Sequence, residues 1–103
     1  MNQTMNRWVD APAPPAFTDK QGQYLAFIWA YSQVNGRAPA ERDLQAYFRV
    51  SPPSVHQMVL TLESAGLIRR TPGQARSIEL CVDPRNLPVL GLPQLVKTTV
   101  QRY

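Results

Sequence analysis

The chain has 103 residues, 44% of them apolar, which suits one small domain with a single core and excludes global disorder. Its net charge is +4, and nine of its 11 basic residues are arginines, so a polyanionic partner is compatible with the charge but not required by it. The single cysteine, Cys81, excludes an internal disulfide, and no apolar run approaches the roughly 20 residues of a membrane span. Residues 1–10 contain no signal-peptide core, so we expect a protein of the reducing cytoplasm without a membrane partner.

Residues 1–16 are predicted to form a flexible N-terminal tail rich in proline and alanine. The run from Ala11 to Ala16 cannot form a helix interior and favours an extended polyproline geometry. Trp8 lies in this tail and could pack either on the body of the domain or on a partner.

A first helix is predicted to begin at Thr18, because Thr18 and Gln21 have the spacing of a capping box. Asn35-Gly36 is expected to end it, since glycine adopts the left-handed conformation of a helix C-terminus at little cost. Between these ends, apolar residues recur at the helical spacing and predict a buried stripe. They are Tyr24, Phe27, Ile28, Tyr31 and Val34.

A short second helix is predicted at about residues 40–48. Leu44, Tyr47 and Phe48 mark its buried face. Its start is weak, because the side chain of Ala40 cannot cap a helix, although Glu41 in the first turn compensates in part through the helix dipole.

A third helix is predicted over residues 51–65, after a tight break at residues 49–51. Ser51 can cap this helix, and Pro52 occupies its first position, where the missing N–H costs nothing. A buried stripe at helical spacing leaves the opposite face polar. The stripe consists of Val55, Met58, Val59 and Leu62.

Two short strands, residues 67–70 and 77–82, are predicted to pair as a hairpin with a tip at residues 71–76 that contains the turn pair Pro72-Gly73. Three helices followed by a two-stranded wing make a mainly α fold, a winged helix-turn-helix domain over residues 17–82. Residues 83–103 are predicted to be a C-terminal extension. Residues 93–103 could form a short helix there, with Leu95, Val96 and Val100 on one side.

Several segments also resemble a known family. Residues 18–21 (Thr-Asp-Lys-Gln) and 35–39 (Asn-Gly-Arg-Ala-Pro) are similar to the start of the DNA-binding domain of LexA-type repressors. Residues 51–56 (Ser-Pro-Pro-Ser-Val-His) resemble the start of that family's recognition helix. Residues 62–70 and 76–80 resemble the end of that helix and its two wing strands. The resemblance covers about residues 17–82. It implies a sequence-specific regulator of transcription that binds double-stranded DNA with the helix at residues 51–65 in the major groove.

Residues 87–91 (Leu-Pro-Val-Leu-Gly) resemble the family's junction with its self-cleaving, dimerising peptidase domain. No Ala-Gly cleavage pair follows Gly91, and no Ser/Lys catalytic pair is present. The resemblance therefore implies DNA binding without self-cleavage.

The outer face of the helix at residues 51–65 carries the side chains expected to contact bases. Gln57 can pair with adenine through two hydrogen bonds, and Ser54 and His56 can each donate or accept. The expected base contacts are Ser54, His56, Gln57 and Thr61. Residues around this helix, and its N-terminal amides, are expected to hold phosphates. They are Ser51, Arg42, Arg49, Arg69, Arg70 and Arg76. For His56, Gln57 and each of the arginines, ordinary solvated surface is the alternative.

A second interpretation stays open, because the third helix contains no lysine or arginine and carries Glu63. Pro53 and Met58 also replace polar residue types common at those places in the family. A winged-helix module that docks another protein, with weak or no DNA binding, would account for these features. It would also account for Leu60, which we expect to be exposed, and for the apolar tails.

Neither an enzyme nor a metal protein is expected. The sequence contains a single histidine, no paired carboxylates in a plausible site and no phosphate-cradling glycine loop. Zinc needs three or four ligands, and His56 and Cys81 alone cannot provide them, so we expect no metal and no cofactor. A homodimer through residues 83–103 and the N-terminal tail would strengthen binding to paired half-sites. The expected location is the nucleoid in a cytoplasm of bacterial or phage type.

Overall fold

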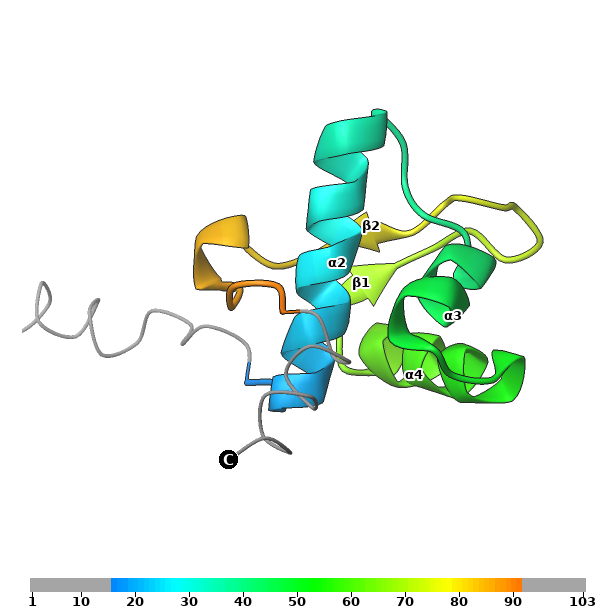
Figure 1. Ribbon diagram of the computed structural model, residues 1–103, viewed down its shortest axis with the longest axis horizontal. Coiled ribbons are helices and arrows are strands. Elements are labelled where there is room, and N and C mark those ends of the chain that lie inside the picture. Colours follow the sequence, from blue (N-terminus) through cyan, green and yellow to red (C-terminus); the bar gives the residue numbers. More distant parts are fainter. Residues whose placement is uncertain (1–15, 92–103) are drawn as a thin grey trace, which may run out of the picture.

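The computed structural model describes residues 16–91. Three helices, α2 (Asp19–Asn35), α3 (Glu41–Phe48) and α4 (Pro52–Ser64), precede strands β1 (Ile68–Arg69) and β2 (Glu79–Leu80), and a 3-10 turn, η1 (Pro84–Asn86), follows them. Helices α3 and α4 pack together to one side of the long α2, and the hairpin crosses α2 with its loop extending towards α3 (Figure 1). This is the predicted winged helix-turn-helix, and residues 68–80 form its wing.

The two caps predicted from the sequence are confirmed. The Thr18 hydroxyl accepts a hydrogen bond from the Gln21 N–H (3.0 Å), and the Gln21 side chain accepts one from the Thr18 N–H (2.9 Å). α2 ends at Gly36, whose φ of 71° is left-handed. Ser51 caps α4 by accepting from the Ser54 N–H (3.3 Å). Local sequence therefore sets both ends of α2 and the start of α4.

The start of α3 has a cap that the sequence analysis missed. Ala40 provides no side-chain acceptor, but the Asp43 carboxylate reaches back and accepts a hydrogen bond from the Ala40 N–H at 2.8 Å. At its other end, α3 stops at Arg49, which has a left-handed φ of 56°. A left-handed φ is uncommon for arginine, so the backbone is strained at this residue in the turn into α4.

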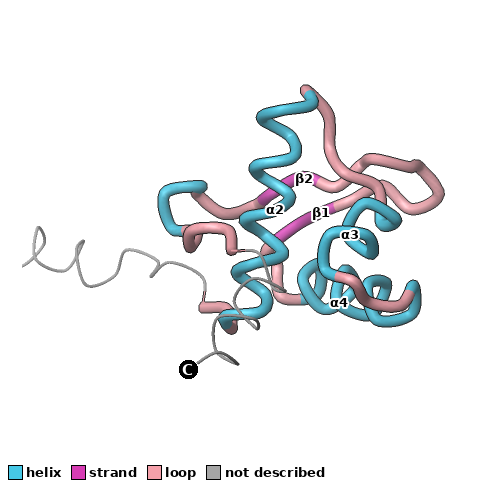
Figure 2. Tube along the Cα trace, viewed as in Figure 1, coloured by secondary structure: helices cyan, strands magenta, loops and turns pink. Residues whose placement is uncertain are grey.

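The wing has a shorter ladder than predicted. Only Ile68 with Leu80 and Arg69 with Glu79 pair as antiparallel strands, so the predicted extents of 67–70 and 77–82 were too long. The remainder of the wing is a long loop (Figure 2). There the Ser77 hydroxyl accepts a hydrogen bond from the Thr71 N–H (2.9 Å) and donates one to the Thr71 carbonyl oxygen (3.1 Å). These side-chain bonds take the place of backbone hydrogen bonds between the two strands.

The core lies where α2, α3, α4 and the hairpin meet. Two aromatic stacks bind α2 to α3: Tyr24 on Phe48, with ring centroids 4.1 Å apart, and Phe27 on Tyr47, at 4.5 Å. Val34, predicted as part of the buried stripe of α2, is 82% exposed, because the last turn of α2 projects beyond the elements that pack on it (Figure 1). No helix within residues 16–91 is long and apolar enough to cross a membrane. The most deeply buried aliphatic residues are Leu25, Ile28, Leu44, Val55, Val59, Leu62, Leu67 and Ile68.

Candidate nucleic-acid interface

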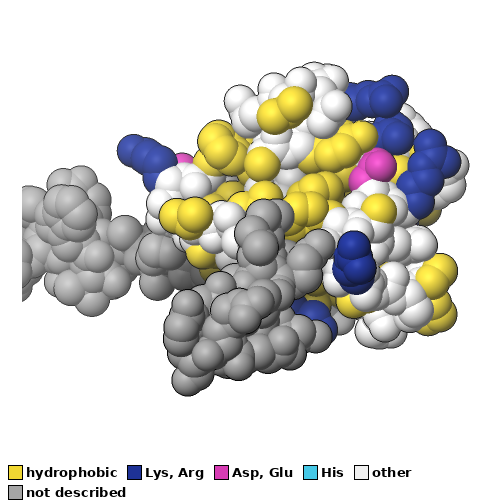
Figure 3. Space-filling view, viewed as in Figure 1, with side chains coloured by type: hydrophobic (Ala, Val, Ile, Leu, Met, Phe, Trp, Pro, Cys, Tyr) yellow, Lys and Arg dark blue, Asp and Glu magenta, His cyan; other side chains and the backbone are white. Residues whose placement is uncertain are grey.

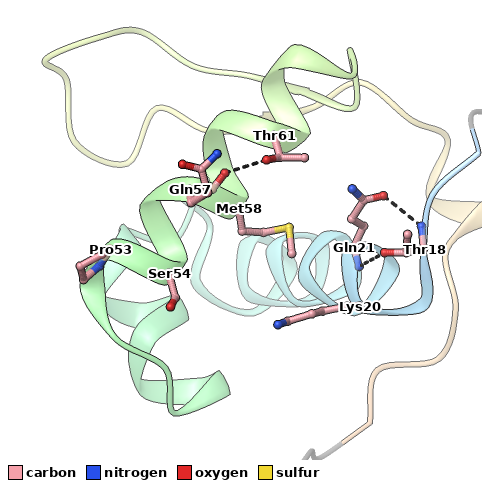
Figure 4. Close-up of a pocket in the computed structure, with 8 residues that line it drawn as sticks. All are labelled: Thr18, Lys20, Gln21, Pro53, Ser54, Gln57, Met58 and Thr61. Carbon is pink, nitrogen blue, oxygen red and sulfur yellow. Dashed lines mark hydrogen bonds between the residues drawn. The ribbon is translucent and has the colours of Figure 1, made fainter.

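Three of the four predicted base-contacting residues line one groove. Ser54, Gln57 and Thr61 are exposed and stand three and four positions apart on α4, so they share a face of the helix. The groove between this face and the first turn of α2 has a volume of about 470 Å³ (Figure 4). The Thr61 hydroxyl donates to the Gln57 carbonyl at 2.9 Å. Within residues 16–91 the Gln57 side-chain amide has no hydrogen-bond partner, so its donor and its acceptor both face solvent.

The opposite wall of the groove carries a basic residue that the sequence analysis missed. Lys20, in the first turn of α2, faces α4 across the groove together with Thr18 and Gln21 (Figure 4). The sequence analysis predicts that residues 18–21 cap α2 and assigns no DNA contact to Lys20. No local signal identifies Lys20, because only tertiary packing brings the start of α2 beside α4.

His56 lies apart from this groove. It is two positions from Ser54 and therefore points to the other flank of α4. There its Nδ1 lies 3.3 Å from an oxygen of Glu41, in the first turn of α3. Within residues 16–91, no three His, Cys, Asp or Glu side chains come together as a metal site would require. A base contact by His56 stays a prediction, and it would have to replace the Glu41 contact.

Ser51 acts within its own helix. Its hydroxyl accepts from the Ser54 N–H and lies 3.0 Å from the Ser54 hydroxyl oxygen, so the two side chains bond to each other. Both residues are exposed. Their hydrogen bonds fix the first turn of α4, which a helix N-terminus needs if it is to present amides to a phosphate.

Two of the predicted phosphate-binding arginines are free in the described part of the chain. Arg42, on α3, and Arg49, at the turn between α3 and α4, are both exposed. Neither forms an ion pair with another residue of the range 16–91. Because α3 packs on α4, both cations lie on or directly after the helix that is the neighbour of α4.

The other three arginines hold the wing together. Arg69 pairs with Glu79 across the strands (2.5 Å), in an exposed position. Arg70, whose side chain is 20% exposed, pairs with Glu63 of α4 at 3.1 Å. Among these residues, Arg69 could exchange its partner for a phosphate most easily, because both members of its pair are in contact with solvent.

Arg76 points inward, towards the junction of α2 and α3. One of its guanidinium nitrogens lies 3.0 Å from the Asp43 carboxylate, 3.1 Å from the Tyr31 hydroxyl and 3.2 Å from the Ala38 carbonyl oxygen. Burial alone would raise the pKa of Asp43, but its hydrogen bond from Ala40 and the positive charge of Arg76 outweigh that effect and lower the pKa. A DNA contact by Arg76 stays a prediction and would require this network to open.

Charge around the interface is concentrated on its flanks. Basic side chains gather on the side of the molecule where α3 and the wing loop lie, with acidic side chains among them (Figure 3). The polar face of α4 itself contains no lysine or arginine. Leu60, expected to be an exposed apolar contact for a protein partner, is instead half-buried.

Comparison with known proteins identifies this arrangement. The family model described as LexA DNA binding domain matches residues 15–77, which include all three helices, β1 and the wing loop. The chain belongs to the LexA DNA-binding domain family. Within this LexA domain, the segments that resemble the family in sequence are the capped start of α2, the link from α2 to α3, the start of α4, the passage from α4 into β1, and the end of the wing loop with β2.

Individual LexA repressors match the same region. That of Thermosipho africanus is 41% identical over 76 residues, which cover 72% of this chain and 38% of the relative. Those of Thermosipho melanesiensis and Geobacter metallireducens are 43% identical over 63 residues and 34% identical over 79 residues. These two matches cover 61% and 73% of this chain. The chain spans 32% to 39% of the length of these three relatives.

Proposed function

We propose that this chain is a sequence-specific transcriptional repressor that binds double-stranded DNA through α4. One observation carries the proposal: Ser54, Gln57 and Thr61 form an exposed polar face on α4 in a member of the LexA DNA-binding domain family. The similar proteins are named LexA repressors, which supports repression over activation.

In the proposed complex, α4 enters the major groove, which is wide enough for one helix. The free amide of Gln57 pairs with an adenine, while Ser54 and Thr61 contact neighbouring base edges. A good bidentate pair of this kind discriminates against a wrong base by about 1–3 kcal/mol. His56 joins from the other flank once a base edge or phosphate draws it from Glu41.

Phosphates are held in this proposal by cations that flank α4. Lys20 lies across the groove, and Arg42 and Arg49 lie on α3 and its final turn. Arg69 adds a wing contact after leaving Glu79. We propose that Arg70 and Arg76 act indirectly, by positioning the wing, since each is paired with an acidic residue of a helix.

Binding strength should depend on salt in a way set by this small number of cations. Four phosphate contacts per domain predict a slope of about −3.6 in a plot of log affinity against log salt. That slope corresponds to a roughly 150-fold loss of affinity between 50 and 200 mM salt. A strongly basic domain, which makes more phosphate contacts, would give a steeper slope in the same plot.

The test is selection of bound duplexes from a random pool, followed by fluorescence anisotropy with the selected duplex and a scrambled one. The proposal expects tighter binding to the selected duplex and the moderate salt slope given above. No enrichment, together with no salt-dependent binding to either duplex, would overturn the proposal in favour of a protein-docking module.

We also propose that two copies occupy paired half-sites, through residues 83–103 and the N-terminal tail, on the chromosome in a bacterial cytoplasm. A domain of this size makes few contacts, and pairing raises affinity through effective concentration. The polar groups that line the α4 groove are hydroxyls, two amides and an ammonium, which suit binding, so the proposal includes no catalytic step. Mass measurement with and without the selected duplex tests the pairing. A strict monomer at high concentration in both samples would rule it out.

A further inference from the structure

The chain returns to α2 after η1, and residues 87–91, here called the C-terminal arm, lie against that helix (Figure 2). The approach is close because Gly22 has no side chain. A Cβ at Gly22 would lie 3.0 Å from Pro88 Cγ and 3.0 Å from Phe17 Cε1. Both leucines of the arm are half-buried against the core. The arm is therefore seated in a notch that α2 provides.

Two side chains fix the end of the arm through its main chain. The Gln23 amide donates to the Val89 carbonyl (2.9 Å) and accepts from the Gly91 N–H (2.7 Å). The Tyr47 hydroxyl donates to the Gly91 carbonyl. One side-chain amide thus satisfies an acceptor and a donor of the arm, as a neighbouring strand would. Gly91 is held from two helices, α2 and α3, and its position is set.

An apolar groove of about 530 Å³ begins at Gly91. Its walls include Tyr24 and Phe48, which stack on each other, and Val50, which precedes the cap of α4. Lys20 and Gln23 add a polar rim. The groove is separate from the one along the polar face of α4, although Lys20 contributes to both.

We propose that residues 92–96 of the same chain occupy this groove. Gly91 is both the last residue of the arm and part of the groove wall, so residue 92 starts at the groove. The segment reads Leu-Pro-Gln-Leu-Val, without a charge, and the first charged residue after it is Lys97. Five extended residues span about 16 Å, so the segment can reach several side chains beyond Gly91.

The same chain is favoured over a second copy as the source of this segment. Because Gly91 is held at the groove, the following residues are present there at an effective concentration of the order of millimolar. A segment from another molecule would first have to displace them. With residues 87–96 engaged within the chain, the pairing proposed above would use the rest of residues 83–103 and the N-terminal tail.

The test is NMR spectroscopy on the full chain, without DNA, with labelled leucine and valine methyl groups. We expect nuclear Overhauser contacts from the methyls of Leu92, Leu95 and Val96 to the rings of Tyr24 and Phe48. Leu95→Asp should abolish these contacts and shift the ring resonances. Val100→Asp, a matched change outside the segment, should leave them unchanged.

Two results would overturn the proposal. One is that no contacts appear and the two variants do not differ in their effect on the ring resonances. The other is that the contacts occur only between chains in a mixture of labelled and unlabelled protein, which would place a second copy in the groove. If Leu95→Asp does not fold, Gln23→Leu provides the same test, because it releases Gly91 and should weaken the contacts.

Discussion

The guanidinium of Arg76, on the wing, lies 3.0 Å from the carboxylate of Asp43, on α3. Both side chains are mostly buried, 20% and 24% exposed, and Arg76 also bonds to Tyr31 of α2. One arginine therefore joins the wing to two helices. In this arrangement the wing is positioned by a polar network, because its strand ladder is too short to hold it.

Replacing Arg76 by alanine should destabilise the fold. The change removes a partly buried ion pair and two further hydrogen bonds, so we expect the free energy of unfolding to fall by about 1–3 kcal/mol in urea denaturation. Arg85→Ala, which removes the exposed pair with Asp83, is the control and should change it by less than about 0.5 kcal/mol. Unchanged stability with uniformly weaker DNA binding would instead support a direct phosphate contact by Arg76.

Acid should weaken the same network. The pKa of Asp43 is below its ordinary value of 3.8, and a carboxyl whose pKa falls on folding stabilises the native state above the unfolded value. That contribution is lost as the pH drops below about 4 and passes through the lower folded pKa. Denaturation measured at several pH values should show a shallower acid loss for Asp43→Asn than for the wild type. An equally steep loss in both proteins would show that Asp43 does not contribute.

Gln57 and Lys20 should affect DNA binding differently. Gln57→Ala should relax the preference at one base pair by about 1–3 kcal/mol, because it removes a bidentate contact. Lys20→Ala should weaken binding to all sequences alike and reduce the salt slope by about 1. Gln33→Ala, on an exposed part of α2 away from the α4 groove, is the control for anisotropy measurements. If Gln57→Ala keeps the full preference, α4 does not read bases in the orientation proposed.

Gly22→Ala should reduce stability, against the usual trend for helices. In an open helix position, alanine is favoured over glycine by about 0.8–1 kcal/mol. At Gly22 the new Cβ would press on Phe17 and on the rigid ring of Pro88, both at 3.0 Å. We expect a lower midpoint of thermal unfolding and a displaced arm. A rise in the midpoint would mean that Pro88 withdraws from α2 at no cost.

Prediction from sequence succeeded where one short segment determines the outcome. The caps at Thr18 and Ser51 and the stop at Gly36 depend on neighbours within four residues. The stripe of α4 was right because every residue of it meets the same core. Val34 continues the stripe of α2 in sequence but is exposed, because the last turn of that helix projects beyond the described elements that pack on it.

The polar face of α4 could be predicted from the sequence, but the positions of the charged residues around it could not. The exposure of Ser54, Gln57 and Thr61 follows from helical spacing. The place of Lys20 opposite them, and the inward direction of Arg76, depend on how distant segments meet. The packing of residues 87–91 was not foreseen either, since an amide and a glycine on α2 carry no signal for a strand-like contact.

The contact between the C-terminal arm and α2 restricts the sequence of the helix more than the sequence of the arm. Gln23 and Tyr47 bond only to main-chain atoms of the arm, which every residue type except proline offers, and Val89 is 90% exposed. Substitutions at Val89 should therefore be tolerated, while α2 must keep a glycine and an amide side by side. Among homologous chains, we expect the residue at the position of Val89 to vary and the glycine and glutamine at the positions of Gly22 and Gln23 to be retained.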